Sequence, residues 1–135
     1  MSVNIFTKKA GVQISPNFNS DEFDCPCDKC DHTLIDEDLV SKLQALRDLT
    51  GASLHINSGY RCQAHQDALT ASGAETAKGV SQHTLGKAAD VKVEGLSGPD
   101  LEVKARDVGF MAVGVAKTWC HLDLRIDKER TWYYK

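Results

Sequence analysis

The stretch Ser81-Gln-His-Thr-Leu-Gly-Lys-Ala-Ala-Asp90 separates a histidine from an acid by six residues, among them a glycine and two alanines. His83 offers a neutral imidazole nitrogen and Asp90 a carboxylate oxygen, and Zn²⁺ accepts both kinds of ligand. A catalytic zinc usually holds three protein ligands, so we look for a third, and His121 in Cys120-His-Leu-Asp-Leu-Arg125 is the candidate. A histidine and an aspartate at this spacing also occur without a metal.

The residues around these candidate ligands alternate between apolar and polar types, as half-buried strands do. Asp90-Val-Lys-Val93 is one such run, and His121-Leu-Asp-Leu-Arg125 is another. Similar patterns predict strands at residues 53–58, 89–93, 113–116, 119–126 and 130–135. With the helices below, they predict an α+β fold, in which helices pack on one side of a small, mostly antiparallel sheet.

A helix is predicted between Asp36, a suitable N-cap, and Gly51, which ends it. Its apolar stripe consists of Leu39, Val40, Leu43, Leu46 and Leu49. Further helices are expected at residues 63–71 and after Ser97, and residues 73–79 are expected to form a loop at the rim of the cleft. Residues 1–17 are predicted to be an extended arm or an edge strand of a single domain, residues 1–135.

Composition excludes several classes of protein. A net charge of −3 and an isoelectric point near 5.9 argue against nucleic acid as the main partner, because no broad basic field is evident. No apolar run approaches the ~18 residues of a membrane span, and residues 1–10 lack the apolar core of a secretory signal. We therefore expect a protein that is made in the cytoplasm, has no membrane span and is a monomer.

Three of the five cysteines lie in Cys25-Pro-Cys-Asp-Lys-Cys30. A second, structural zinc held by Cys25, Cys27 and Cys30, with Cys62 or His32 as the fourth ligand, is one interpretation. Reduced thiols packed near the site are the other, because Cys-x-Cys-x₂-Cys is a looser pattern than paired Cys-x₂-Cys units.

Three motifs in this order resemble the family of zinc D-Ala-D-Ala carboxypeptidases, which share the hedgehog/DD-peptidase fold. They are Ser58-Gly-Tyr-Arg61, Ser81–Asp90 and His121–Arg125, and the resemblance extends to Phe18–Phe23 and Gly109–Gly114. It implies a zinc metallopeptidase that hydrolyses D-Ala-containing peptide stems of bacterial peptidoglycan. Both D,D-carboxypeptidase and endopeptidase activity fit such a site.

The same resemblance implies roles for residues beside the metal. Arg61 corresponds to a substrate-facing arginine that binds an oxyanion or a carboxylate, and Ser81 to a serine that holds substrate. The alternative for Arg61 is a surface salt bridge.

The general base is the point at which this sequence departs from the family. Relatives place an acid or a histidine two or three residues before the last zinc histidine, where this chain has Trp119 and Thr118. Asp123 faces the same side of a strand as His121, so it either accepts the proton of the water or orients a ligand, as a partner of His121 or Arg125.

Two other classes of function stay open beside the peptidase. One is a catalytically weak or inactive zinc-binding module of the same fold, which the residues at 118 and 119 favour. The other is a cysteine-rich redox or metal-storage protein, but this does not explain the His and Asp motifs. Without a signal peptide, an enzyme that acts on the cell wall must be delivered to it separately or released by lysis. A phage lysin and an enzyme of wall remodelling are the two biological settings that we consider.

Overall fold

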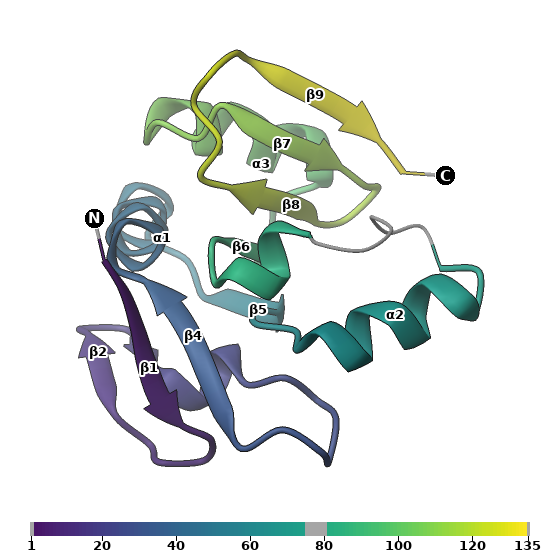
Figure 1. Ribbon diagram of the computed structural model, residues 1–135. Helices are drawn as coiled ribbons and strands as arrows, with labels where there is room; N and C mark the ends of the chain where they lie inside the picture. Colours follow the sequence, from purple (N-terminus) through teal and green to yellow (C-terminus); the bar gives the residue numbers. More distant parts are fainter. Residues whose placement is uncertain (1, 75–80, 135) are drawn as a thin grey trace.

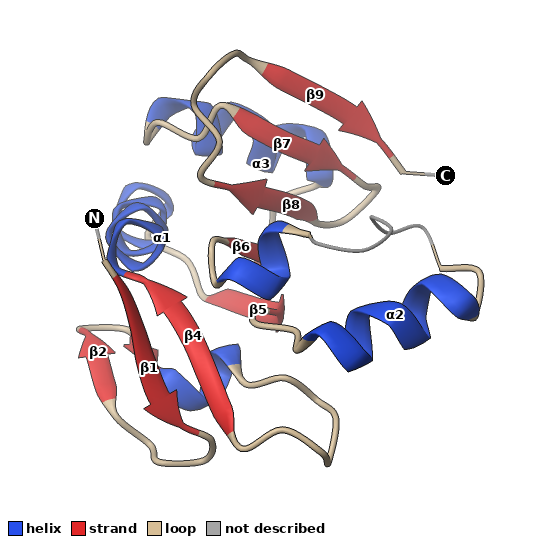
Figure 2. Cartoon of the chain, in the orientation of Figure 1, coloured by secondary structure: helices blue, strands red, loops and turns tan. Residues whose placement is uncertain are grey.

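The structure is a computed structural model, and it describes residues 2–74 and 81–134. Its main sheet has five strands in the order β5-β6-β8-β7-β9. The strands are β5 (Leu54–Ser58), β6 (Ala88–Val93), β7 (Ala112–Val115), β8 (Cys120–Asp123) and β9 (Arg130–Tyr133). All pairs are antiparallel except β7 with β9, which are parallel. This confirms the predicted α+β fold with a mostly antiparallel sheet (Figures 1 and 2).

The N-terminal part forms two small antiparallel sheets beside the main one (Figure 1). One pairs β1 (Val3–Thr7) with β4 (His32–Asp36), and the other pairs β2 (Gln13–Ser15) with β3 (Phe18–Asn19). The 3-10 helix η1 (Ser20–Phe23) follows, capped by Asn19. The residues expected to be an arm or an edge strand therefore contain two strands, one of them paired with a strand that the sequence patterns did not predict.

Helix α1 (Glu37–Thr50) begins and ends where the sequence predicts. The Asp36 side chain accepts a hydrogen bond from the backbone N–H of Asp38, at 2.8 Å, and Gly51 adopts a left-handed conformation with φ of 63°. Leu39, Leu43 and Leu46 are fully buried. Leu49, at the last turn, is 49% exposed, so the buried stripe is one residue shorter than expected.

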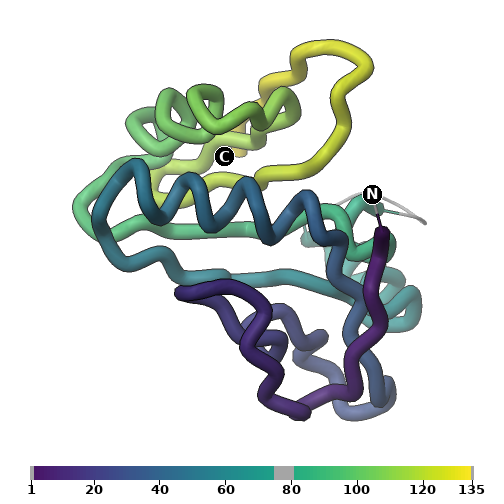
Figure 3. Tube along the Cα trace, turned by 90° about the vertical axis from the view of Figure 1, so that its left-hand side faces the viewer, coloured from purple at the N-terminus to yellow at the C-terminus, as the bar shows by residue number. Residues whose placement is uncertain are grey.

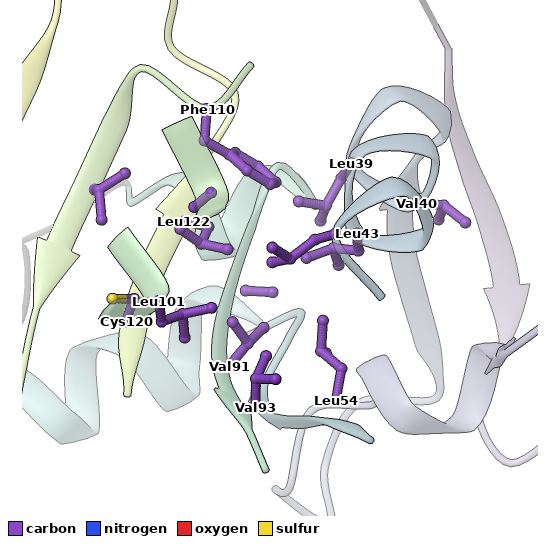
Figure 4. Packing of buried hydrophobic residues seen from close by; sticks show 14 of the residues in the cluster. Leu39, Val40, Leu43, Leu54, Val91, Val93, Leu101, Phe110, Cys120 and Leu122 are labelled. Atoms are coloured by element: carbon purple, nitrogen blue, oxygen red, sulfur yellow. The ribbon is translucent and has the colours of Figure 1, made fainter. Parts of the chain in front are cut away.

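The hydrophobic core lies between one face of the main sheet and the helices α1 and α3 (Gly98–Asp107), which pack against each other on that face (Figure 3). Figure 4 shows Leu39 and Leu43 of α1 directed into the core, which also contains Val91 and Val93 of β6. Burying one such leucine contributes about 1.5–3 kcal/mol relative to an exposed side chain. Helix α2 (Gln63–Ala71) follows β5, and residues 75–79 of the predicted rim loop lie outside the described residues.

Alternation along β6 and β8 sends their polar residues to the opposite face of the sheet. Ala89, Val91 and Val93 enter the core, whereas Asp90 points away from it. Cys120 and Leu122 of β8 also enter the core, so His121 lies on the same face as Asp90, directly across from it in the register. The core therefore determines which side chains meet on the other face. No helix in the described part of the chain is long and apolar enough to cross a membrane.

Candidate metal centre

The structure brings the three predicted ligands together. His83 comes from the 3-10 helix η2 (Gln82–Leu85), which Ser81 caps, while Asp90 and His121 come from neighbouring strands. Asp90 Oδ1 lies 3.2 Å from His83 Nε2 and 3.1 Å from His121 Nδ1, and the two nitrogens are 3.2 Å apart. Ligand atoms about 2.0 Å from a tetrahedral zinc are about 3.3 Å apart, so the donor set and its spacing fit Zn²⁺.

The second nitrogen of each imidazole is bound to an oxygen that can only accept. His83 Nδ1–H donates to the carbonyl oxygen of Gly59 at 2.7 Å, and His121 Nε2–H donates to Asp123 Oδ2 at 2.8 Å. In neutral imidazoles this leaves lone pairs on His83 Nε2 and His121 Nδ1, which both face Asp90. Three lone-pair acceptors at this distance repel one another unless a cation lies among them.

Hydrogen bonds also set the charge of these groups. Burial by itself raises the pKa of Asp90, but when the facing nitrogens of His121 and His83 carry protons, their hydrogen bonds lower it below its usual range. For His121, burial lowers the pKa, but the carboxylates of Asp123 and Asp90 raise it above its ordinary value. A proton and a metal ion therefore compete for His121 Nδ1.

Arg61 lies beside the outer oxygen of Asp90, with its Nη2 3.1 Å from Asp90 Oδ2. Its Nε donates to Ser58 Oγ at 3.1 Å, and its Nη1 donates to Gln66 Oε1 at 3.2 Å. The Arg61 side chain is only 12% exposed. It is therefore not the surface salt bridge that was the alternative, because it is held from several sides next to the candidate ligands.

Gln66 is a site residue that the sequence patterns missed. It lies on α2, its side chain is fully buried, and its Oε1 accepts hydrogen bonds from both Arg61 and Ser81, the latter at 3.3 Å. The two residues with expected substrate roles therefore share one acceptor. Nothing in the local sequence distinguishes it from the other polar residues of α2.

Asp123 lies on the far side of His121 from the ligand atoms. Both of its oxygens are occupied: Oδ2 accepts from His121 and from Arg125 Nη2 at 2.9 Å, and Oδ1 accepts from the Arg125 Nε and backbone N, each at 3.0 Å. Burial raises its pKa, but these donors lower it to about 2. Of the two roles that the sequence left open, this geometry supports orientation of His121, not acceptance of a proton from water.

The positions at which the resemblance leads us to expect a base carry no such group here. Thr118 is exposed, and the Trp119 ring packs against Tyr134 with ring centroids 4.9 Å apart. Another aromatic side chain, that of Trp132 on β9, lies against the His121 ring at 5.2 Å. Gly114 leaves room for it, since a Cβ there would approach Trp132 Nε1 to 2.5 Å.

The cysteine motif forms a second cluster outside this centre. Its sulfur atoms belong to Cys25, Cys27, Cys30 and Cys62. His32, the alternative fourth ligand, is not a member; its Nε2 lies 3.1 Å from the Tyr60 hydroxyl instead.

The fold and this centre define a class: α+β proteins with a candidate metal centre on one face of a small sheet. A sequence profile of the peptidase M15 family matches residues 16–123. The chain belongs to this family of zinc-dependent metallopeptidases, which confirms the resemblance to zinc D-Ala-D-Ala carboxypeptidases.

One solved structure supports the same fold. It is the crystal structure of the L-Ala D-Glu endopeptidase ChiX of Serratia marcescens, which has 20% sequence identity and a TM-score of 0.53. The similarity covers 67% of this chain and 80% of ChiX. No curated protein is significantly similar in sequence.

Proposed function

We propose that the protein is a zinc-dependent peptidase that hydrolyses D-Ala-containing peptide stems of bacterial peptidoglycan. The observation that carries this proposal is the convergence of three acceptors, from His83, Asp90 and His121, within 3.2 Å of one another. Membership of the peptidase M15 family and the ChiX fold support the same reaction class.

Bound among these three ligands, Zn²⁺ supplies a Lewis acid that polarises a carbonyl group and lowers the pKa of water. The chain's own residues prepare the centre for it. Gly59 and Asp123 fix the tautomers of His83 and His121, so that each presents a lone pair. All three side chains are largely buried, which restricts changes of rotamer.

Arg61 is the residue that we assign to the developing negative charge of the substrate. Its guanidinium is oriented by Ser58 and Gln66 and lies beside Asp90, so it is held next to the three residues that would bind the metal. A preorganised donor of this kind typically contributes about 10²–10³ in rate. Ser81, tied to the same Gln66, is assigned to substrate binding.

Carboxypeptidase and endopeptidase activity differ in the product released. Purified protein with zinc is incubated with bacterial peptidoglycan, and the products are resolved by mass spectrometry. Free D-alanine would identify a D,D-carboxypeptidase, and cleaved cross-links or stems without free D-alanine would identify an endopeptidase. His121→Ala, checked for native circular dichroism, is the control and should release neither.

A second candidate is a zinc-binding module with little or no hydrolytic activity. The specific observation in its favour is that Thr118 and Trp119 stand where relatives carry a base, while Asp123 is occupied by Arg125 and His121. Stoichiometric zinc without any peptidoglycan product would decide for this module and against the peptidase.

A further inference from the structure

Four cysteine sulfur atoms gather beside Arg61, on a part of the chain that the proposed hydrolysis does not use. Cys25, Cys27 and Cys30 lie in the segment between η1 and β4, and Cys62 is the N-cap residue of α2. Their sulfur atoms all lie within 4.8 Å of one another. The measured separations are 3.8 Å for Cys25 with Cys62, 3.5 Å for Cys27 with Cys62 and 3.4 Å for Cys27 with Cys30.

These separations distinguish between the two chemistries open to a cysteine cluster. A disulfide requires sulfur atoms about 2.05 Å apart, and all five cysteines are free thiols. Four sulfur atoms at about 2.3 Å from a tetrahedral Zn²⁺ are about 3.8 Å from one another. The cluster is thus already close to the shape of a tetrathiolate zinc site.

Burial by itself raises the pKa of the Cys25 and Cys30 thiols, but donors around the cluster would stabilise thiolates bound to a metal ion. Lys8 Nζ lies 3.5 Å from Cys30 Sγ and also donates to the Cys27 carbonyl oxygen. Backbone N–H groups of Cys27 and Cys62 are directed at the Cys25 sulfur, and those of Lys29 and Cys30 at the Cys27 sulfur. A zinc ion with four thiolates carries a charge of about −2, which one lysine and these amide dipoles offset in part.

We propose that Cys25, Cys27, Cys30 and Cys62 bind a second, structural Zn²⁺. All four ligands come from the protein, so the site leaves no position for substrate, in contrast to the centre formed by His83, Asp90 and His121. The proposal does not rest on the hydrolytic function, because it concerns metal held by different residues.

The segment Ser58–Cys62 shows what such a zinc would stabilise. The Gly59 carbonyl accepts from His83, the Tyr60 N–H donates to the Phe23 carbonyl at 2.8 Å, and the Arg61 N–H donates to the His83 carbonyl at 3.2 Å. A Cβ on Gly59 would approach Phe23 Cα to 2.7 Å, so the two segments are in close contact. Zinc on Cys62 would fasten the end of this segment to residues 25–30 and so hold Arg61 in place.

The first test measures the zinc content of purified variants by inductively coupled plasma mass spectrometry. Wild type should contain about two zinc ions per chain, and His121→Ala and Cys27→Ser about one each. Cys120→Ser is the matched control, because Cys120 is a buried thiol outside the cluster that donates to the Gly98 carbonyl oxygen at 3.2 Å. It should keep about two.

The second test begins with wild-type protein, which keeps all of its thiols. Wild-type protein is titrated with an organomercurial, which displaces zinc from thiolates, and the released zinc is followed with a chromophoric chelator. About one zinc per chain should appear as about four thiols react. A separate measurement uses His121→Ala loaded with Co²⁺, in which thiolate-to-cobalt charge-transfer absorption should appear. This absorption should be absent from the double variant His121→Ala/Cys27→Ser.

Two results would overturn the proposal. One is a natively folded His121→Ala protein that contains no zinc and shows no thiolate-to-cobalt absorption. The other is a mass showing that cysteines of the cluster are joined in disulfides in freshly purified protein. If wild-type protein releases zinc on treatment with the mercurial but does not hydrolyse peptidoglycan, only the proposed function is contradicted.

Discussion

Replacing Asp123 by asparagine tests the assignment of this residue as the partner that orients His121. Asp123 is fully buried and receives four hydrogen bonds, one from His121 and three from Arg125. Asparagine keeps the shape but replaces one acceptor oxygen by an NH₂ donor. Whichever way the amide turns, a donor then faces the N–H groups of Arg125 or of His121.

The expected loss of zinc affinity depends on which hydrogen bond of Asp123 is lost. If the amide NH₂ faces His121, the imidazole must change tautomer and present Nδ1–H to the metal, which abolishes its role as a ligand. If it faces Arg125, the loss is smaller, because that side chain is 35% exposed and water replaces part of the contact. Removing an outer partner of this kind typically lowers metal affinity by about 10–100-fold, or about 1.4–2.7 kcal/mol.

The assay measures the zinc dependence of peptidoglycan hydrolysis, which separates affinity from turnover. For Asp123→Asn, the apparent zinc dissociation constant should rise by about 10–100-fold, while the rate at saturating zinc should fall by less than about tenfold. The matched control is Asp127→Asn, which makes the same change of charge at an exposed residue paired with Arg130. It should behave like wild type in both respects.

A different pattern would refute the reasoning. If Asp123 accepts a proton from water, Asp123→Asn keeps its zinc affinity and loses about 10²–10⁴ in rate at saturating zinc. Should wild type show no hydrolysis at all, competition with a chromophoric chelator gives the affinities directly. Equal zinc affinity of Asp123→Asn and wild type would then be sufficient to reject the orienting role.

Four further predictions concern the site and its support. Arg61→Lys should retain zinc but lose about 10²–10³ in kcat/KM, since lysine cannot keep the fixed set of donors. Leu43→Ala, which truncates a fully buried side chain of α1, should lower the free energy of unfolding by about 2–5 kcal/mol in urea denaturation. Gly114→Ala should cost about 1–3 kcal/mol and change tryptophan fluorescence, because its Cβ would displace Trp132. At limiting zinc, occupancy should fall as the pH drops through the raised pKa of His121, and occupancy that is constant well below neutrality would contradict proton competition.

Local signals in the sequence were sufficient for much of the fold. The Asp36 cap, the apolar stripe and Gly51 specify α1 with interactions that span only a few residues. Alternation likewise predicted β6 and the polar face of β8, which carry Asp90 and His121. These predictions succeed because the order of apolar and polar residues along the chain shows the period of a helix or a strand directly.

What the sequence did not predict depends on contacts between distant segments. Strand β4 exists because Ile5 of β1 pairs with Leu34, and no local pattern specifies that partner. Gln66 belongs to the site only because α2 places it between Arg61 and Ser81. Neither relationship can be derived from spacing along the chain.

The arrangement of the metal centre follows from the register of the whole sheet. Ser58, Asp90, His121, Gly114 and Trp132 are successive partners across all five strands, and they form one row on the face away from the core. A slip of one residue in β8 would turn His121 into the core and expose its apolar neighbours. Burial of those neighbours, rather than any bond to a metal, therefore selects the register in which the ligands meet. It follows that the metal-free protein should keep this sheet, and that zinc binds to a centre whose strand-borne ligands are already in place.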